Sequence, residues 1–210
     1  MKPVILLLIV LLFIGGCTHY TAVPAERRTV GSLYSVKSTV AWSQADEGGI
    51  QVWTIDGPLL DALRFVTLND GDTLFRSTDK DAKFPRFRAH MTPNEVTEFF
   101  VASLKSVSGG VDTHQLTKGM VQPARITAGS VNAASIDVKN LRPADFGRLP
   151  GFRFDFSFLS KEGLERQGIA FGSIHEGKLL LMVYTGTKEY YFDKHKQDVE
   201  TIFSSVELVQ

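Results

Sequence analysis

The residue with the most distinctive chemistry is Cys17, the only cysteine in the sequence of 210 residues. It follows Gly15 and Gly16 at the end of an apolar run from Val4 to Ile14. Small residues at this place let the chain lie extended in the active site of a signal peptidase. The residues before Cys17 therefore meet this requirement of a signal peptidase.

The apolar run is too short to be a comfortable permanent membrane span. Its eleven residues rise only about 16 Å as a helix, at 1.5 Å each. The hydrocarbon core of a bilayer is about 30 Å thick. With Lys2 as a short positive segment ahead of it, the run is typical of a secretory signal.

The segment Ile14-Gly15-Gly16-Cys17 resembles the lipobox of bacterial lipoproteins, with Ile for the commoner Leu and Gly for Ala or Ser. The resemblance implies cleavage between Gly16 and Cys17, diacylglycerol on the Cys17 thiol and acylation of the new α-amine. Each buried CH₂ contributes about 0.8 kcal/mol, so two or three chains hold a protein firmly at a membrane. The alternative is an ordinary secretory signal followed by a stray cysteine.

The residue after the cysteine bears on localisation. In Gram-negative lipoproteins an Asp at this position retains the product in the inner membrane, and here the residue is Thr18. The resemblance therefore implies a cell-envelope protein anchored in the outer membrane and facing the periplasm. A Gram-positive origin would instead place the anchor on the plasma membrane.

Three carboxylates, Asp155, Glu162 and Glu165, lie on or beside a strand rich in phenylalanine. Two carboxylates that the fold brings together can hydrolyse a glycosidic bond. An envelope hydrolase acting on cell-wall glycan is therefore the alternative function. Charge on a solvated strand face is the commoner explanation, and we predict no catalytic residue.

We also predict no metal and no cofactor apart from the covalent lipid. An EF-hand loop placed on Asn69-Asp70-Gly71-Asp72 would begin at Val66, which offers no side-chain ligand. His175-Glu176 lacks the second histidine of the zinc helix motif. His195 lies on an apolar stripe, which indicates a hydrogen-bonded core histidine.

Trp42 and Trp53 are the aromatic side chains that could form a binding surface. Tryptophan is enriched at binding hot spots, and two rings that line a groove could stack on a sugar or a peptide. The other interpretation places both rings in the core.

The composition favours one domain that holds together by packing. Removal of residues 1–16 leaves 194 residues, with 22 Lys and Arg against 23 Asp and Glu. A chain of this length can bury a real core. Because phosphate binding needs clustered Lys and Arg, this balance argues against nucleic acid as a partner. We expect a signal peptide at 1–16, a lipidated flexible tether at 17–32 and a single domain at 33–210.

Alternating apolar residues predict the strands of this domain. Strands are expected at 33–42, 50–55, 65–68, 152–158, 169–174 and 178–185, with weaker ones at 124–128 and 135–138. Turns are expected at 44–49 and at 69–72, the second being a hairpin that returns through 73–76, and 142–151 is expected to be irregular. The strand at 152–158 must bury its phenylalanine face, and Arg153 and Asp155 on its polar face are expected to pair.

Two helices are predicted. Thr92-Pro93-Asn94-Glu95 has the capping-box pattern of a helix start, and Ser108-Gly109-Gly110 ends that helix. The terminal helix is expected to bury one stripe: Phe192, His195, Val199, Ile202, Phe203 and Val206.

Four short segments near the C-terminus resemble the PsbP-like superfamily. They are Gly151-Phe152-Arg153-Phe154, Lys178-Leu179-Leu180-Leu181, Thr185-Gly186-Thr187 and Tyr191-Phe192-Asp193. The resemblance implies an α+β fold, a central antiparallel β-sheet with amphipathic helices packed on it in an α/β/α sandwich. It also implies a non-catalytic binding or assembly module. We therefore expect a lipid-anchored envelope lipoprotein that binds an envelope protein or glycan.

Overall fold

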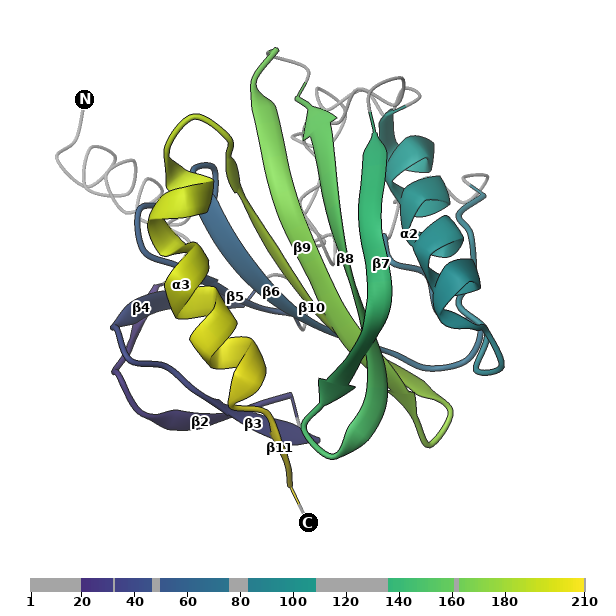
Figure 1. Ribbon diagram of the computed structural model, residues 1–210, viewed down its shortest axis with the longest axis horizontal. Helices are drawn as coiled ribbons and strands as arrows, with labels where there is room; N and C mark the ends of the chain where they lie inside the picture. The colour runs from purple at the N-terminus through teal and green to yellow at the C-terminus, as the bar shows by residue number, and fades with distance from the viewer. Residues whose placement is uncertain are drawn as a thin grey trace, which may run out of the picture.

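An eight-stranded antiparallel sheet carries one helix on each face, with a small three-stranded sheet beside it (Figure 1). The computed structural model describes residues 20–31, 33–46, 50–75, 83–108, 136–160 and 163–209. This arrangement confirms the predicted α+β fold. Among these residues, no helix is both long enough and apolar enough to cross a membrane.

The strand order places the last hairpin of the chain at the centre of the large sheet. In spatial order the strands are β1 (Thr21–Val23), β4 (Trp42–Asp46), β5 (Gln51–Thr54), β6 (Asp61–Leu68), β10 (Lys178–Thr187), β9 (Glu165–His175), β8 (Leu149–Leu159) and β7 (Asp137–Phe146). The small sheet has the order β11 (Glu207–Leu208), β3 (Tyr34–Lys37) and β2 (Arg27–Val30). Strand β10 is buried along nearly its whole length, as the apolar run at 179–184 predicts.

The phenylalanine face of β8 packs under helix α2 (Pro93–Ser108). The Phe100 ring lies edge-on to Phe154 and Phe156, with ring centroids 5.4 and 5.0 Å apart. The predicted capping box is present, because Thr92 N donates to Glu95 Oε2 at 2.7 Å and Thr92 Oγ1 accepts from Glu95 N at 3.4 Å.

Helix α3 (Tyr191–Ser204) covers the opposite face of the sheet and buries the predicted stripe up to Phe203, whereas Val206 is buried beyond the end of the helix. Its start is fixed by Tyr184 on β10, whose hydroxyl donates to the backbone oxygens of Tyr191 and Phe192. Burial raises the pKa of the Tyr184 phenol. The two helices therefore lie on different faces, supported by separate clusters of apolar side chains.

The predicted tether at 17–32 is wrong in its boundary. Strands β1 and β2 lie within it, and both Val23 and Val30 are completely buried. Arg27 of β2 binds Glu207 at 2.8 Å and the backbone oxygen of Ser205 at 3.0 Å, so this segment is joined to the C-terminus. Strands of three and four residues are too short to show an alternating pattern.

The prediction of an irregular segment at 142–151 is also wrong. The segment belongs to the β7–β8 hairpin, whose turn contains Gly147 at φ +63°. Strand β7 is an edge strand, where Pro143 is tolerated because a proline there need not donate to the ladder. A register shift between Lys139 and Arg142 further interrupts the pairing.

Three smaller predictions need correction. Strand β4 continues through Asp46, so residues 44–46 do not belong to the expected turn, and β6 begins at Asp61 instead of 65. The 69–72 turn is not a hairpin, because β6 is already paired with β5 and β10 and offers no free edge to a returning strand. The chain enters the core instead, where Leu74 and Phe75 are buried. The strand expected at 124–128 lies outside the described residues.

Candidate functional site

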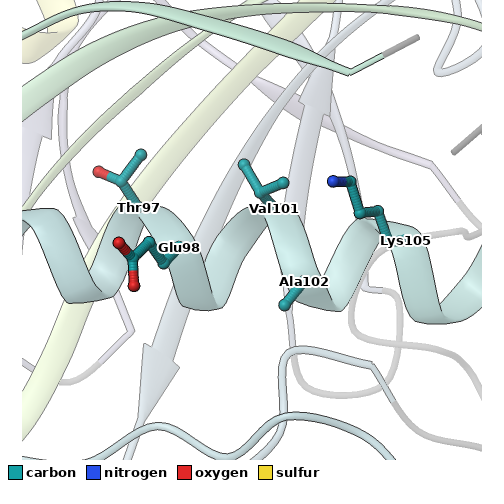
Figure 2. Close-up of a pocket in the computed structure, with 5 residues that line it drawn as sticks. All are labelled: Thr97, Glu98, Val101, Ala102 and Lys105. Atoms are coloured by element: carbon teal, nitrogen blue, oxygen red, sulfur yellow. The ribbon is translucent and has the colours of Figure 1, made fainter. Parts of the chain in front are cut away.

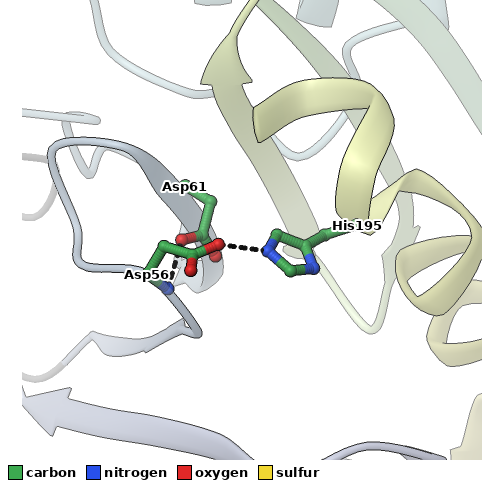
Figure 3. A group of neighbouring side chains, drawn as sticks. All are labelled: Asp56, Asp61 and His195. Atoms are coloured by element: carbon green, nitrogen blue, oxygen red, sulfur yellow. Dashed lines mark hydrogen bonds and ion pairs between the residues drawn. The ribbon is translucent and has the colours of Figure 1, made fainter. Parts of the chain in front are cut away.

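Three ionisable side chains, Asp56, Asp61 and His195, come together where the β5–β6 connection meets helix α3 (Figure 3). Asp61, at the start of β6, is completely buried. Its carboxylate accepts hydrogen bonds from Thr54 Oγ1, Ile55 N and Asp56 N at 3.1, 2.9 and 2.7 Å. The Thr54 hydroxyl in turn accepts from Gly57 N at 2.8 Å. These bonds shape the tight connection that presents Asp56.

Asp56 joins this connection to α3. Its Oδ2 lies 2.5 Å from His195 Nε2, and Lys194 Nζ donates to its two carboxylate oxygens at 2.9 and 2.7 Å. The hydrogen bond from His195 lowers the pKa of Asp56, and that from Lys194 lowers it further. Asp56 in turn raises the pKa of Lys194. We call Asp56, Lys194 and His195 the helix clamp.

The clamp is better suited to structure than to metal binding. One ligand atom each from Asp56, Asp61 and His195 lies within 4.8 Å of the others. However, both oxygens of Asp61 already accept hydrogen bonds from the connection. The ammonium group of Lys194 supplies the positive charge that a cation would bring to Asp56. The arrangement is therefore complete with the residues present.

The surroundings of His195 are not those of a general base. Its side chain is only 7% exposed, and its Nδ1 lies 3.9 Å from Asp198 Oδ2 while Nε2 faces Asp56. A catalytic histidine needs a nucleophile or substrate at one ring nitrogen. Both nitrogens here face carboxylates, which orient the ring and hold α3 in place. This environment agrees with the expectation of a hydrogen-bonded core histidine.

Trp42 and Trp53 lie in the core beside the clamp and do not form a binding surface. They are 2% and 0% exposed. The Trp42 ring lies 6.4 Å from the Trp53 ring and 6.3 Å from the His195 ring, between centroids, and its Nε1 donates to Ser38 Oγ at 2.9 Å. The rings therefore cannot stack on a sugar or a peptide.

The fold does not pair the two described carboxylates of the hydrolase hypothesis. Asp155 stands opposite Ile169 and Glu165 stands opposite Leu159, so they lie four residues apart along the β8–β9 ladder. Four residues span about 13 Å of strand, beyond the ~5–9.5 Å between the carboxyl groups of a glycosidase. Each has its own partner, since Asn140 donates to Asp155 and Lys188 binds Glu165. Glu162 lies outside the described residues.

Arg153 keeps the predicted ion pair with Asp155 as a long contact and binds a second carboxylate more closely. Its two terminal nitrogens bind the Glu200 carboxylate of α3, whereas its Nε lies 4.0 Å from Asp155. The planar guanidinium favours a two-point contact with one carboxylate, and only the tertiary fold brings Glu200 there. Glu200 raises the pKa of Arg153.

A hollow lies on the outward side of α2, which sequence analysis did not predict as a site. It is lined by Thr97, Glu98, Val101, Ala102 and Lys105 (Figure 2). A second hollow shares Glu98 and Ala102 with it and extends toward the loop before the helix. We call the two together the α2 groove. Its signal in the sequence is weak: Val101 and Ala102 are apolar residues off the buried stripe of the helix.

The second hollow adds further residues to this groove. Its described lining residues are Pro85, Arg86, Arg88, His90, Met91, Glu95, Glu98, Phe99 and Ala102. The groove therefore combines apolar side chains with charges of both signs. Such a surface suits a partner that offers apolar groups together with charged or hydrogen-bonding ones.

Comparison with known proteins identifies a similar fold. No protein-family model matches the chain, and no curated protein matches it in sequence. The solution structure of cyanobacterial PsbP (CyanoP) from Synechocystis sp. PCC 6803 matches with a TM-score of 0.52 and 15% identity, covering 93% of this chain and 96% of that one. The architecture is thus PsbP-like, as the C-terminal motifs predicted.

Two further structures are less similar. A crystal structure from Bacteroides thetaiotaomicron VPI-5482 has a TM-score of 0.46 at 11% identity over 90% of this chain, which spans 50% of that chain. LpqN, involved in cell envelope biogenesis of Mycobacterium tuberculosis, has a TM-score of 0.37 at 10% identity, covering 94% of this chain and 88% of that one. The likeness to PsbP, at its low identity, concerns the fold alone.

Proposed function

We propose that the protein is a lipid-anchored, non-catalytic cell-envelope lipoprotein that acts as a binding or assembly module. The observation that carries the proposal is the lipobox ending at Cys17, four residues ahead of strand β1 at Thr21. Cys17 and Gly16 lie outside the described residues, and their modification is part of the proposal. Thr18 supports an outer-membrane anchor that faces the periplasm.

The binding surface in this proposal is the α2 groove. Helix α2 lies on the face of the sheet opposite α3, so a partner in the groove would leave the helix clamp undisturbed. The exposed small side chain of Ala102 lines both hollows of the groove. An envelope protein or a glycan strand would contact Val101 and Ala102 and be oriented by the charges around them.

Fractionation tests the anchor. The wild-type protein is expected in the membrane fraction, cleaved after Gly16, whereas Cys17→Ser is expected to lose the lipid and that cleavage. A Cys17→Ser protein that is cleaved at the same bond and stays on the membrane would contradict the proposal.

Cross-linking in intact envelopes tests the binding surface. Ala102→Arg fills the α2 groove, and Gln197→Arg adds the same charge at an exposed position of α3. The proposal predicts that cross-links to an envelope partner are lost in Ala102→Arg and kept in Gln197→Arg. Equal cross-linking of both variants would refute the α2 groove as the binding surface. Release of reducing sugar from cell-wall glycan by the protein would instead establish the alternative function, an envelope hydrolase.

A further inference from the structure

Strands β1 and β2 take up a part of the chain that could otherwise serve as a long tether. Residues 20–30 would span at most about 40 Å if they were extended. Instead, β1 pairs with β4 and β2 pairs with β3, and both Val23 and Val30 are completely buried. The steps along the chain from Cys17 to Thr21 span at most about 14 Å. The proposed lipid therefore lies close to the edge of the large sheet that β1 forms.

The pairing of the large sheet locates the α2 groove relative to this edge. A single row of paired residues crosses the sheet from β1 to β8. In order, its members are Thr21, Gln44, Trp53, Leu63, Tyr184, Ile169 and Asp155. At about 4.8 Å between neighbouring strands, the row is about 29 Å long. It ends between Phe154 and Phe156, on which Phe100 of α2 packs. Accordingly, β4 and α2 lie at opposite sides of the molecule in Figure 1.

The α2 groove therefore stays within a limited distance of the proposed lipid. It lies on the outward side of a helix that is about 10–12 Å wide with its side chains, which places it roughly 15 Å from the sheet. Together with the steps along the chain and across the sheet, this limits its distance from the lipid on Cys17 to about 50 Å. The limit holds in any orientation of the domain as long as β1 stays paired with β4.

We propose that the partner in the α2 groove is a protein held in the same membrane as Cys17, and not the cell-wall glycan. This inference rests on the proposed lipid anchor and on the proposed binding surface. A protein of the same membrane is always within the limit of about 50 Å. The glycan is a separate layer, and a domain that binds it would need the reach that β1 and β2 take away. Two proteins confined to one membrane also meet at a high effective concentration, so a small groove suffices.

Photo-cross-linking with two tether lengths in intact envelopes tests this inference. A photoreactive amino acid at Thr97 reports the partner in the groove, and the same amino acid at Gln197, on the exposed side of α3, is the control. In the second form of each protein a flexible Gly-Ser segment of about 20 residues, with an r.m.s. length of about 25 Å, stands between Thr18 and His19. The insertion precedes β1, so the urea midpoint should not change, and intact-mass analysis checks that both forms carry the lipid.

At Thr97 we expect a cross-link to a membrane protein that withstands digestion of the glycan and is lost in Ala102→Arg. Its yield should fall severalfold with the longer tether, because a longer tether lowers the effective concentration. Cross-links to glycan or to a protein outside the membrane would overturn the inference and leave the anchor and the α2 groove in place, as would a yield that stays equal or rises with the longer tether. Cross-linking no stronger at Thr97 than at Gln197 in both forms would refute the α2 groove itself, and the inference with it.

Discussion

Replacement of Asp56 by alanine tests the helix clamp, which holds α3 on the sheet. The change removes the only oxygen within hydrogen-bond distance of His195 Nε2 among the described contacts, and leaves a side chain that is 7% exposed without that partner. It also removes both bonds from Lys194. The backbone bonds to Asp61 do not depend on the Asp56 side chain, so the connection itself should keep its shape.

The expected cost follows from how deeply each contact is buried. A hydrogen bond to a charged group contributes about 1.5–3 kcal/mol, and an unsatisfied buried partner adds to the loss. The Lys194 ion pair contributes at most about 1 kcal/mol, because both side chains are partly exposed, at 34% and 25%. We therefore expect Asp56→Ala to lower the free energy of unfolding by about 2 kcal/mol, mostly through His195.

Urea unfolding of the mature chain at pH 7 measures this loss. Gln197→Ala, on the exposed side of the same helix, is the control and should change the free energy of unfolding by less than about 0.5 kcal/mol. In the double variant Asp56→Ala/Lys194→Ala the second change should add little, since both residues act through one contact. An Asp56→Ala chain as stable as Gln197→Ala would refute the clamp. A large loss of wild-type stability on adding EDTA would show instead that a metal holds the cluster.

Three further predictions concern pH and local packing. The folded-state pKa of Asp56 lies below its usual value, so the stabilisation by its carboxylate should be complete above about pH 5 and lost as the pH falls through the folded pKa. The difference between the urea midpoints of wild type and Asp56→Ala should therefore narrow from pH 5 to pH 3. A constant difference would contradict this prediction. Thr92→Ala removes the capping-box hydroxyl that bonds Glu95 and should cost about 1 kcal/mol, measured by thermal unfolding; an unchanged melting temperature would argue against the cap. Gly168→Ala would place a Cβ 2.2 Å from the ring of Phe156 and should cost about 1–3 kcal/mol, so a urea midpoint equal to that of wild type would show that this ring moves aside freely.

The sequence predicted the elements whose signals are local and strong. The capping residues Thr92 and Glu95 fixed the start of α2, and the phenylalanine alternation at 152–158 identified β8 and the face that it buries. The apolar run at 179–184 placed β10 inside the sheet. In each case one face or end carries a chemical pattern that few other structures would satisfy.

The sequence failed where tertiary context decides. Pro143 and Pro150 suggested a break, but both lie in the hairpin beside the sheet edge that β7 forms. Strands β1 and β2 are stabilised by partners far along the chain, including Glu207, which binds Arg27. Nothing local distinguishes such short segments from a flexible tether.

The candidate site residues show the same difference between local signals and tertiary context. The sequence predicts His195 as a core residue, which agrees with the structure, and does not single out its partner Asp56. Their contact joins residues 139 positions apart, which no local spacing can reveal. Arg153 likewise lies closer to Glu200 of α3 than to its strand neighbour Asp155, with which it keeps the predicted ion pair at 4.0 Å.

Intact-mass analysis of the protein extracted from membranes tests the lipid anchor most directly. The account predicts a chain that begins at residue 17, with a diacylglyceryl group on the Cys17 sulfur and a fatty acid on its α-amine. A membrane-derived protein with a free thiol at residue 17, or one that still carries residues 1–16, would contradict it.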